Sequence, residues 1–338
     1  MIRGFATTEG TARIAARFPL FYRHAQDLQV SNIGIGSYLG AMDDATDRGY
    51  TESVREAVSA GLNFIDTSLN YRNQKSERAI GLALRDLKRD ELVVCTKAGF
   101  LVKDAMPASL RREDVVENMH SMAPDFLADQ LERSRQNLGI ETIDVFYLHN
   151  PETQLNRVAP SEFHARIERA FEFLERAAAD GKIRFYGTAT WDGYRRRPDA
   201  PEGLSLVTLY AIAERIGGAG HHFRFIQLPF NLAMPEAYVL LRDGENLLTT
   251  AARLGITVVS SASILQGRLA RNLPEGLTSQ LPGIETDAQR ALQFTRSTPG
   301  ITVALVGMSK PQHVHENLGL APLPPLKEPE YQALYRQG

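Results

Sequence analysis

The chain has 338 residues, of which 43% are hydrophobic and 23% are charged, a balance typical of a globular protein long enough to bury a core. Its formal net charge of −2 gives no electrostatic reason to expect nucleic acid or an anionic membrane as a partner. A single cysteine, Cys95, excludes an intramolecular disulfide and a zinc site built from several cysteines, and it fits a reducing compartment.

The N-terminal segment MIRGFATTEGTARIAARF contains no apolar run of the kind found in signal peptides. No run elsewhere approaches the roughly 20 apolar residues of a membrane helix, so we interpret the protein as cytoplasmic. Residues 1–30 form an extension ahead of the first predicted strand, and we expect them to lie across the bottom of the fold.

From about residue 33 onward, short apolar runs alternate with longer amphipathic segments almost to the end of the chain. Most of the short runs are rich in valine and isoleucine and are apolar at successive positions, which is typical of parallel strands covered on both faces. Eight runs are predicted to be strands: Ile33–Ser37, Asn63–Thr67, Leu92–Lys97, Ile143–His149, Ile183–Thr188, Arg224–Leu228, Ile256–Ser260 and Ile301–Val306.

The segments between these runs have helical spacing, and several of them end in a glycine that suits the left-handed cap of a short loop. These glycines are Gly61, Gly139, Gly181 and Gly255. Eight strand-plus-helix units in series predict an α/β fold, a single (β/α)8 TIM barrel over residues 31–320, with an open doubly wound sheet as the alternative. Residues 321–338, which include APLPPLKEPE, are predicted to form a proline-rich extended tail.

Three neighbouring predicted strands each end in an ionisable residue. Asp66, Lys97 and His149 close the second, third and fourth strands, and Tyr71 follows on the loop after the second. Each residue alone has an ordinary structural explanation, such as a turn cap, a solvated strand end, rim packing or a satisfied loop histidine. Because the carboxyl ends of parallel barrel strands meet at one rim, we expect the four side chains to lie together.

Together these side chains suit proton donation to a carbonyl oxygen. A neighbouring ammonium lowers the pKa of a phenol, ordinarily about 10, and Lys97 would supply that charge to Tyr71. Asp66 would hold Lys97 in place, and His149 could donate a hydrogen bond to the oxygen where negative charge develops. A general acid of this kind still needs a reactant that adds to the carbonyl carbon.

The sequence offers no serine or cysteine nucleophile with an evident partner, and no spacing of metal ligands. The close histidine pairs, His221 with His222 and His313 with His315, are interpreted as exposed surface residues. A dissociable hydride donor is therefore the predicted missing reactant.

Several motifs resemble a known family. The stretches GLNFIDTSLNY with SERAIG, VVCTK, SRQNLGIETIDVFYLHNP and VGMSKPQHVHENL are similar, in order and at family spacing from about residue 28 to 320, to the aldo-keto reductases. These are (β/α)8 carbonyl reductases that depend on NADPH. The resemblance implies that Asp66, Tyr71, Lys97 and His149 correspond to the family's catalytic tetrad, with Tyr71 as the general acid during reduction.

The resemblance also implies that the nicotinamide lies across the barrel mouth, with the adenosine phosphates near the last two strand-to-helix loops. Backbone N–H groups at a helix start suit anionic oxygens at that place. The cofactor residues that it implies are Gly36, Ser37, Thr190, Gln227, Ser261, Gly307, Ser309, Lys310, His313, Glu316 and Asn317.

The expected cofactor pocket departs from the family pattern. Gly187-Thr188-Ala189-Thr190 stands where the family usually has Gly-Val-Ser-Asn, and Ser261 replaces the aromatic residue that stacks on the nicotinamide. Gln227 is expected to hydrogen-bond the carboxamide, and Trp191 either offers another stacking face or only packs. The family's 2′-phosphate arginines fall at about Ser309 and His313, which leaves Lys310 as the nearby cation. We therefore expect NADPH, with NADH possible.

Arg72 and Lys75 follow Tyr71 where glycines are common in the family. They are interpreted as solvated, with attraction of an anionic substrate as the alternative. The predicted function is reduction of a small aldehyde or ketone without a metal. The alternatives are a barrel that binds a nucleotide or another ligand with little turnover, and a lyase or isomerase that uses the same acid-base groups.

Overall fold

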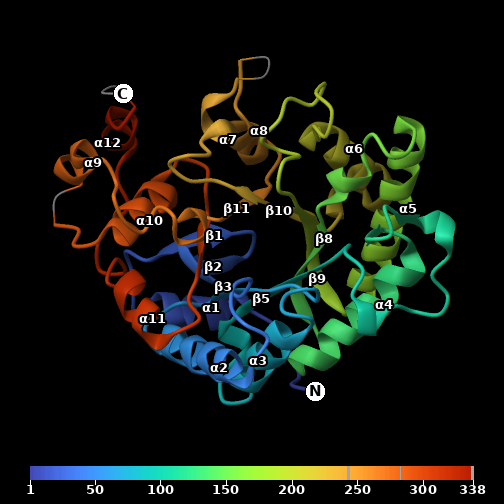
Figure 1. The fold of residues 1–338 in the computed structure, drawn as a ribbon, viewed down its shortest axis with the longest axis horizontal. Coiled ribbons are helices and arrows are strands. Elements are labelled where there is room, and N and C mark those ends of the chain that lie inside the picture. Colours follow the sequence, from blue (N-terminus) through green and yellow to red (C-terminus); the bar gives the residue numbers. More distant parts are fainter. Residues whose placement is uncertain (242–243, 282, 336–338) are drawn as a thin grey trace.

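The computed structural model describes residues 1–241, 244–281 and 283–335. Eight parallel strands close into a barrel in the order β10-β11-β12-β3-β4-β5-β8-β9, with helices around the outside (Figure 1). This confirms the predicted barrel over the open sheet, and each strand begins and ends within two residues of its predicted run. The strands are β3 (Ile33–Gly36), β4 (Phe64–Asp66), β5 (Val93–Ala98), β8 (Ile143–His149), β9 (Ile183–Ala189), β10 (Phe223–Pro229), β11 (Thr257–Ser261) and β12 (Val303–Gly307).

The helices between the strands bury their apolar stripes against the barrel. In α5 the buried residues include Phe163, Ile167, Phe171 and Leu174, which carry the helical spacing of the sequence. The outer helices are α2 (Asp44–Ser59), α3 (Lys75–Leu84), α4 (Pro124–Leu138), α5 (Pro160–Ala179), α6 (Leu206–Gly217), α7 (Glu236–Val239), α8 (Leu247–Arg253), α9 (Glu275–Gln280), α10 (Asp287–Ser297) and α11 (Pro311–Leu318). Short 3-10 helices are η1 (Arg89–Glu91), η2 (Lys103–Ala105), η3 (Arg112–Asp114), η4 (Pro151–Gln154), η5 (Gly218–Gly220) and η6 (Leu265–Gly267).

The glycines predicted at the ends of four helices have the left-handed conformation that the short loops need. The φ angles are 99° at Gly61, 69° at Gly139, 71° at Gly181 and 66° at Gly255. Each loop therefore returns the chain to the amino end of the next strand within a few residues.

The N-terminal segment forms helix α1 (Thr8–Ala15) and a hairpin of β1 (Tyr22–Ala25) and β2 (Leu28–Ser31). Leu28 and Val30 of the hairpin belong to the same buried cluster as Val93 and Val303, near the amino ends of barrel strands. The backbone N–H of Ala6 donates to the Asp144 carboxylate at 2.8 Å. This segment thus closes the end of the barrel opposite the carboxyl ends of the strands.

The C-terminal segment differs from the predicted extended tail. A short helix, α12 (Glu328–Ala333), forms with Pro329 in its first turn, where the missing proline N–H costs no helical hydrogen bond. Tyr331 is fully buried and its hydroxyl accepts from Thr298 Oγ1 at 2.8 Å. Residues 336–338 of the predicted tail lie outside the described residues.

Candidate active site

A cavity of about 710 Å³ opens at the carboxyl ends of the barrel strands. Asp66 at the end of β4, Tyr71 on the following loop and His149 at the end of β8 line its inner part. Lys97, near the end of β5, is fully buried directly beside Asp66. The four ionisable residues that the sequence placed at one rim therefore lie together.

Asp66 and Lys97 form a buried ion pair. Lys97 Nζ donates to Asp66 Oδ2 at 2.6 Å and to the carbonyl oxygen of Thr67 at 2.8 Å. Its ammonium also lies 4.9 Å from the centre of the Tyr71 ring. The second carboxylate oxygen of Asp66 accepts from Gln227 Nε2 at 2.9 Å, so the carboxylate is held on both sides.

The electrostatics of Tyr71 differ from the sequence-based expectation. Burial raises the pKa of Tyr71 above its ordinary value, and the nearby Lys97 ammonium opposes this rise without reversing it. Burial alone would lower the pKa of Lys97, but the Asp66 carboxylate and the Tyr71 hydroxyl outweigh it and raise that pKa. Tyr71 is thus a protonated phenol beside a charged lysine.

His149 is a neutral imidazole in this site. Burial, the Lys97 charge and His120 together hold the pKa of His149 well below its usual value. Its Nδ1 lies 3.2 Å from Ser68 Oγ. The Phe100 ring packs edge-on against it with ring centres 5.0 Å apart.

A second buried histidine supports the backbone of His149. His120 Nε2 lies 2.7 Å from the carbonyl oxygen of His149, so this nitrogen donates, and His120 Nδ1 accepts from Gln154 Nε2 at 3.0 Å. Burial lowers the pKa of His120 to about 4, which keeps the ring neutral. His120 belongs to the small hairpin of β6 (Val115–Val116) and β7 (His120–Ser121) in the loop after β5.

Most of the predicted cofactor residues line the same cavity. They are Gly36, Ser37, Thr190, Gln227, Ser261, Gly307, Ser309, His313, Glu316 and Asn317. Lys310 is exposed and is not among the lining residues. The loop after β12 can approach helix α2 closely because Gly49 has no side chain: a Cβ there would lie 2.4 Å from the Ser309 carbonyl oxygen.

Gln227 and Trp191, the two residues expected near the nicotinamide, both line the cavity, but only the Gln227 side chain is held by another rim residue. The Gln227 amide donates one of its two N–H hydrogens to Asp66 Oδ1, which leaves the second hydrogen and Oε1 for a carboxamide. Trp191 lines the cavity and is 38% exposed. Its backbone N–H donates to Glu152 Oε1 at 2.7 Å, and the next two N–H groups, at Asp192 and Gly193, point to the same oxygen.

Several lining residues were not named from the sequence: Tyr38, Leu39, Asn70, Phe100, Asn150 and Arg271. They lie on loops after β3, β4, β5, β8 and β11. Asn70 and Asn150 belong to the motifs that contain Tyr71 and His149, whereas no periodicity or motif marks the other four. Arg271 is the informative one, because it provides a guanidinium at the cavity wall. Only the folded loop brings it there.

Two interpretations of charged or polar residues were wrong. Arg72 has a side chain only 2% exposed; it pairs with Asp47 at 2.6 Å and donates to the carbonyl oxygen of Ala41. Lys75 contacts Asp47 at 2.9 Å and keeps 33% of its side chain exposed, so only Arg72 departs from the solvated interpretation. His221, interpreted as an exposed surface residue, is buried at 1% exposure and packs against the Tyr210 ring.

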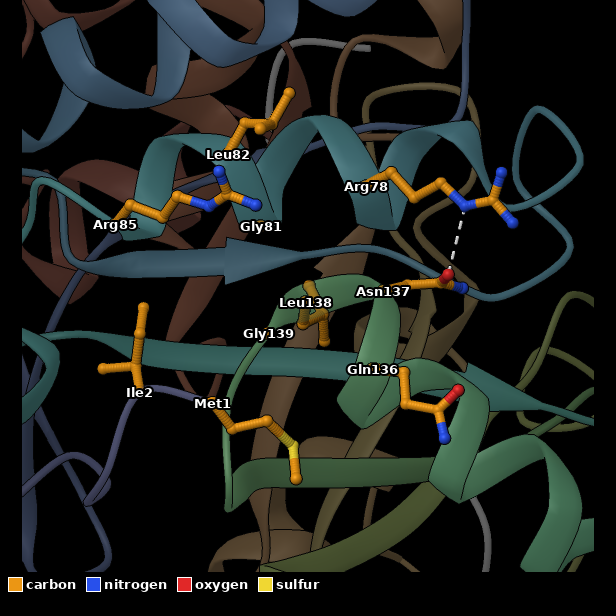
Figure 2. A pocket seen from close by; sticks show the side chains of 10 residues that line it. All are labelled: Met1, Ile2, Arg78, Gly81, Leu82, Arg85, Gln136, Asn137, Leu138 and Gly139. Carbon is orange, nitrogen blue, oxygen red and sulfur yellow. Dashed lines mark hydrogen bonds between the residues drawn. The ribbon is translucent and has the colours of Figure 1, made fainter.

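A second hollow, of about 570 Å³, lies on the outer wall between α3 and α4, beside the first residues of the chain (Figure 2). Arg78 Nε donates to Asn137 Oδ1 across it at 3.1 Å. None of the four rim residues lines this hollow. It is a feature of helix packing and is separate from the chemistry at the barrel mouth.

Within the described residues, no three histidine, cysteine or carboxylate side chains are grouped closely enough to hold a metal ion. Over the same part of the chain, every helix is too short or too polar to cross a membrane.

Comparison with known proteins gives consistent results. The model of the aldo/keto reductase family matches residues 32–280. The putative voltage-gated potassium channel subunit beta of Schizosaccharomyces pombe is 26% identical over 331 residues, covering 89% of this chain and 87% of that protein. The NADH-specific methylglyoxal reductase of Escherichia coli is 29% identical over 196 residues, 56% of this chain and 58% of that protein. The crystal structure of an aldo/keto reductase from Klebsiella pneumoniae in complex with NADP and acetate has a TM-score of 0.65, 21% identity and 94% coverage of both chains.

Proposed function

This chain belongs to the aldo/keto reductase family, and we propose that it reduces a small aldehyde or ketone with a nicotinamide cofactor, using Tyr71 as the general acid. The observation that carries this proposal is the position of Tyr71. Its ring lies on the cavity wall, and the Lys97 ammonium is 4.9 Å from the ring centre, held there by Asp66.

The residues at the outer part of the cavity fit a dinucleotide. Asn317 Oδ1 is buried and has no hydrogen-bond partner among the described residues, although Asn317 lines the cavity. This acceptor suits the amino group of an adenine. Ser309 and Arg271 can hold phosphate oxygens, and Gln227 Oε1 can accept from the carboxamide. When bound, the reduced nicotinamide supplies the hydride.

Residues of this chain donate the proton and stabilise the tyrosinate that remains. The Tyr71 hydroxyl hydrogen passes to the carbonyl oxygen as the carbon receives the hydride, so the products are an alcohol and the oxidised cofactor. Lys97 stabilises the tyrosinate left behind, because an ammonium beside the ring favours the charged form. Asp66 keeps Lys97 oriented, and Gln227 keeps Asp66 oriented.

The cofactor preference that we propose is NADPH, with NADH also accepted. Arg271 at the cavity wall supports a phosphorylated ribose, although Lys310, the cation expected from the sequence, lies outside the lining. Both cofactors occur among the similar proteins: the Klebsiella pneumoniae structure is a complex with NADP, and the Escherichia coli relative is NADH-specific.

The test begins with fluorescence titration of the purified protein by NADPH and by NADH, followed by the loss of nicotinamide absorbance on adding a panel of aldehydes. Tyr71→Phe is expected to lower kcat by about 10²- to 10⁴-fold with the cofactor Kd unchanged, because only the acid is removed. Tyr38→Phe is the matched control, since Tyr38 lines the cavity with its ring centre 5.0 Å from that of Tyr71. A Tyr71→Phe enzyme with normal turnover would rule out the acid assignment.

A binding barrel with little turnover is the second candidate. It is favoured by Ala189 and Ser261, which give the nicotinamide neither the amide contacts nor the stacking ring expected of the family. Tight nucleotide binding without oxidation by any carbonyl compound would support this candidate over the reductase.

A further inference from the structure

Ser68, between β4 and Tyr71, is fully buried and has three polar neighbours. Its Oγ lies 2.6 Å from Asn70 Oδ1, 3.2 Å from the carbonyl oxygen of Lys97 and 3.2 Å from His149 Nδ1. The hydroxyl has a single hydrogen to give, so these contacts cannot all be made with Ser68 as the donor.

Counting hydrogens decides the direction of the contact with His149. Asn70 Oδ1 and the Lys97 carbonyl oxygen can only accept, and Asn70 Oδ1 is the nearest of the three. Once Ser68 donates to either oxygen, its own lone pair faces His149 Nδ1, and that nitrogen must be the donor. A neutral imidazole carries one N–H, so Nε2 is then a bare acceptor.

We propose that Ser68 fixes His149 with its proton on Nδ1, so that the ligand-free site offers an acceptor nitrogen and binds an alcohol in preference to the corresponding carbonyl compound. Both an alcohol and a carbonyl oxygen can accept from the Tyr71 hydroxyl, but only the alcohol has a hydrogen to donate to Nε2, so a carbonyl compound leaves that nitrogen unpaired. Ser68 is thus a positioning residue that acts through His149. The choice of alcohol and carbonyl as ligands rests on the proposed function, while the state of the ring does not.

Carbonyl binding then requires a defined rearrangement. The Ser68 hydroxyl turns from Asn70 to His149, and the ring exchanges protons with solvent water: Nδ1 gives its proton up and Nε2 takes one up. Nε2 can then donate to the carbonyl oxygen. No bond between heavy atoms is formed or broken: the ring double bonds shift with the proton, and the ring stays neutral. Asn70 lines the cavity, so a bound ligand can draw its side chain away from Ser68 and favour this change.

The ring state can be measured directly in the ligand-free protein. In ¹⁵N-histidine-labelled protein at neutral pH, with the His149 signals assigned from a His149→Gln variant, the wild type is expected to show the proton on Nδ1. Ser68→Ala removes the acceptor for that proton and is expected to move it to Nε2, while Ser68→Thr keeps the hydroxyl and the wild-type pattern. Ser53→Ala is the control, because Ser53 is equally buried and its hydroxyl has no hydrogen-bond partner.

A wild-type ring protonated on Nε2, or a Ser68→Ala ring still protonated on Nδ1, would overturn the proposal. This measurement needs neither cofactor nor turnover, so its result stands apart from the proposed reductase activity. If no carbonyl compound is reduced, the proposed function fails while the spectrum still decides the ring state.

The ligand preference is tested by kinetics with benzaldehyde as substrate and benzyl alcohol as inhibitor. Ser68→Ala is expected to raise the ratio of the benzyl alcohol Ki to the benzaldehyde KM by about 3- to 10-fold, the value of one neutral hydrogen bond. Ser53→Ala is expected to leave that ratio unchanged. An unaltered ratio in Ser68→Ala would show that the ring state does not select between alcohol and carbonyl.

Discussion

Two buried carboxylate-cation pairs lie at opposite ends of the barrel. Asp66 pairs with Lys97 at the carboxyl end, and Asp144 pairs with Arg89 near the amino end, each at 2.6 Å. Asp144 also accepts the backbone N–H groups of Ala6 and Val94, both at 2.8 Å, which tie the N-terminal segment to the strands. The two pairs share a distance and differ in their surroundings.

From this difference we infer that the Asp144–Arg89 pair stabilises the fold, whereas the Asp66–Lys97 pair serves the cavity. Around Asp144 the further partners are backbone groups, so the pair has no free side to present to a ligand. Around Asp66 the further partner is the Gln227 side chain, and Asp66 and Tyr71 both line the cavity. The cations differ as well, because Arg89 cannot lose its charge whereas a buried lysine can.

The largest expected effect is the loss of stability on substituting Asp144. Asp144→Ala leaves the Arg89 guanidinium buried and unpaired, and we expect it to lower the free energy of unfolding by about 3–5 kcal/mol. The matched variant Asp66→Ala is expected to cost less stability, since Lys97 can give up its proton, yet to lose reductase activity. Urea denaturation measures the free energy of unfolding of each variant, and kcat, corrected for the folded fraction, measures its activity. If Asp144→Ala lost kcat but kept its free energy of unfolding, the conclusion that the Asp144–Arg89 pair serves stability would be wrong.

A third buried carboxylate, Glu152, is paired with no cation in the part of the chain that the structure describes. Three backbone N–H groups face its Oε1, and its Oε2 is buried without a partner. Burial raises its pKa from 4.5 to about 7. Because the pKa in the folded protein is the higher one, the stabilising contribution is complete below about pH 4.5 and is lost as the pH rises through about 7.

Glu152→Gln removes this titration. The difference in unfolding free energy between wild type and variant is therefore expected to change by about 3 kcal/mol across that pH window, with the wild type relatively more stable at the acid end. Urea denaturation of both proteins at several pH values measures it. Two curves that run parallel with pH would refute the prediction.

The smallest expected effect is at the cofactor end of the cavity. In Gly49→Ala the new Cβ would meet the Ser309 carbonyl oxygen, so the loop after β12 must shift and we expect the NADPH Kd to rise by up to about tenfold, or about 1.4 kcal/mol. Helix propensity favours alanine by about 1 kcal/mol, which offsets strain in the fold itself. Gly276→Ala in α9 is the control, because nothing lies within 4 Å of its added Cβ. Equal Kd values for the two variants would show that the approach of α2 to this loop is unimportant for binding.

The barrel and the cluster at its rim were predictable from the sequence. Runs of valine and isoleucine at fixed spacing define strands buried on both faces, as in β8, whose bounds were predicted without error. Strands of one barrel share a carboxyl end, so Asp66, Lys97 and His149 had to meet. These conclusions depend only on local periodicity and on a rule of topology.

Other properties were decided by the tertiary structure, because they depend on what surrounds each group. The pKa of Tyr71 rises because several elements bury it, and Arg72 is paired because α2 brings Asp47 to it. Arg271 reaches the cavity only through the fold of a loop, and α12 forms where Tyr331 finds a buried site. The direction of the hydrogen bond between Ser68 and His149 is set by two oxygens that compete for one hydrogen. Such competition is a matter of distances in the folded chain, which the order of residues does not contain.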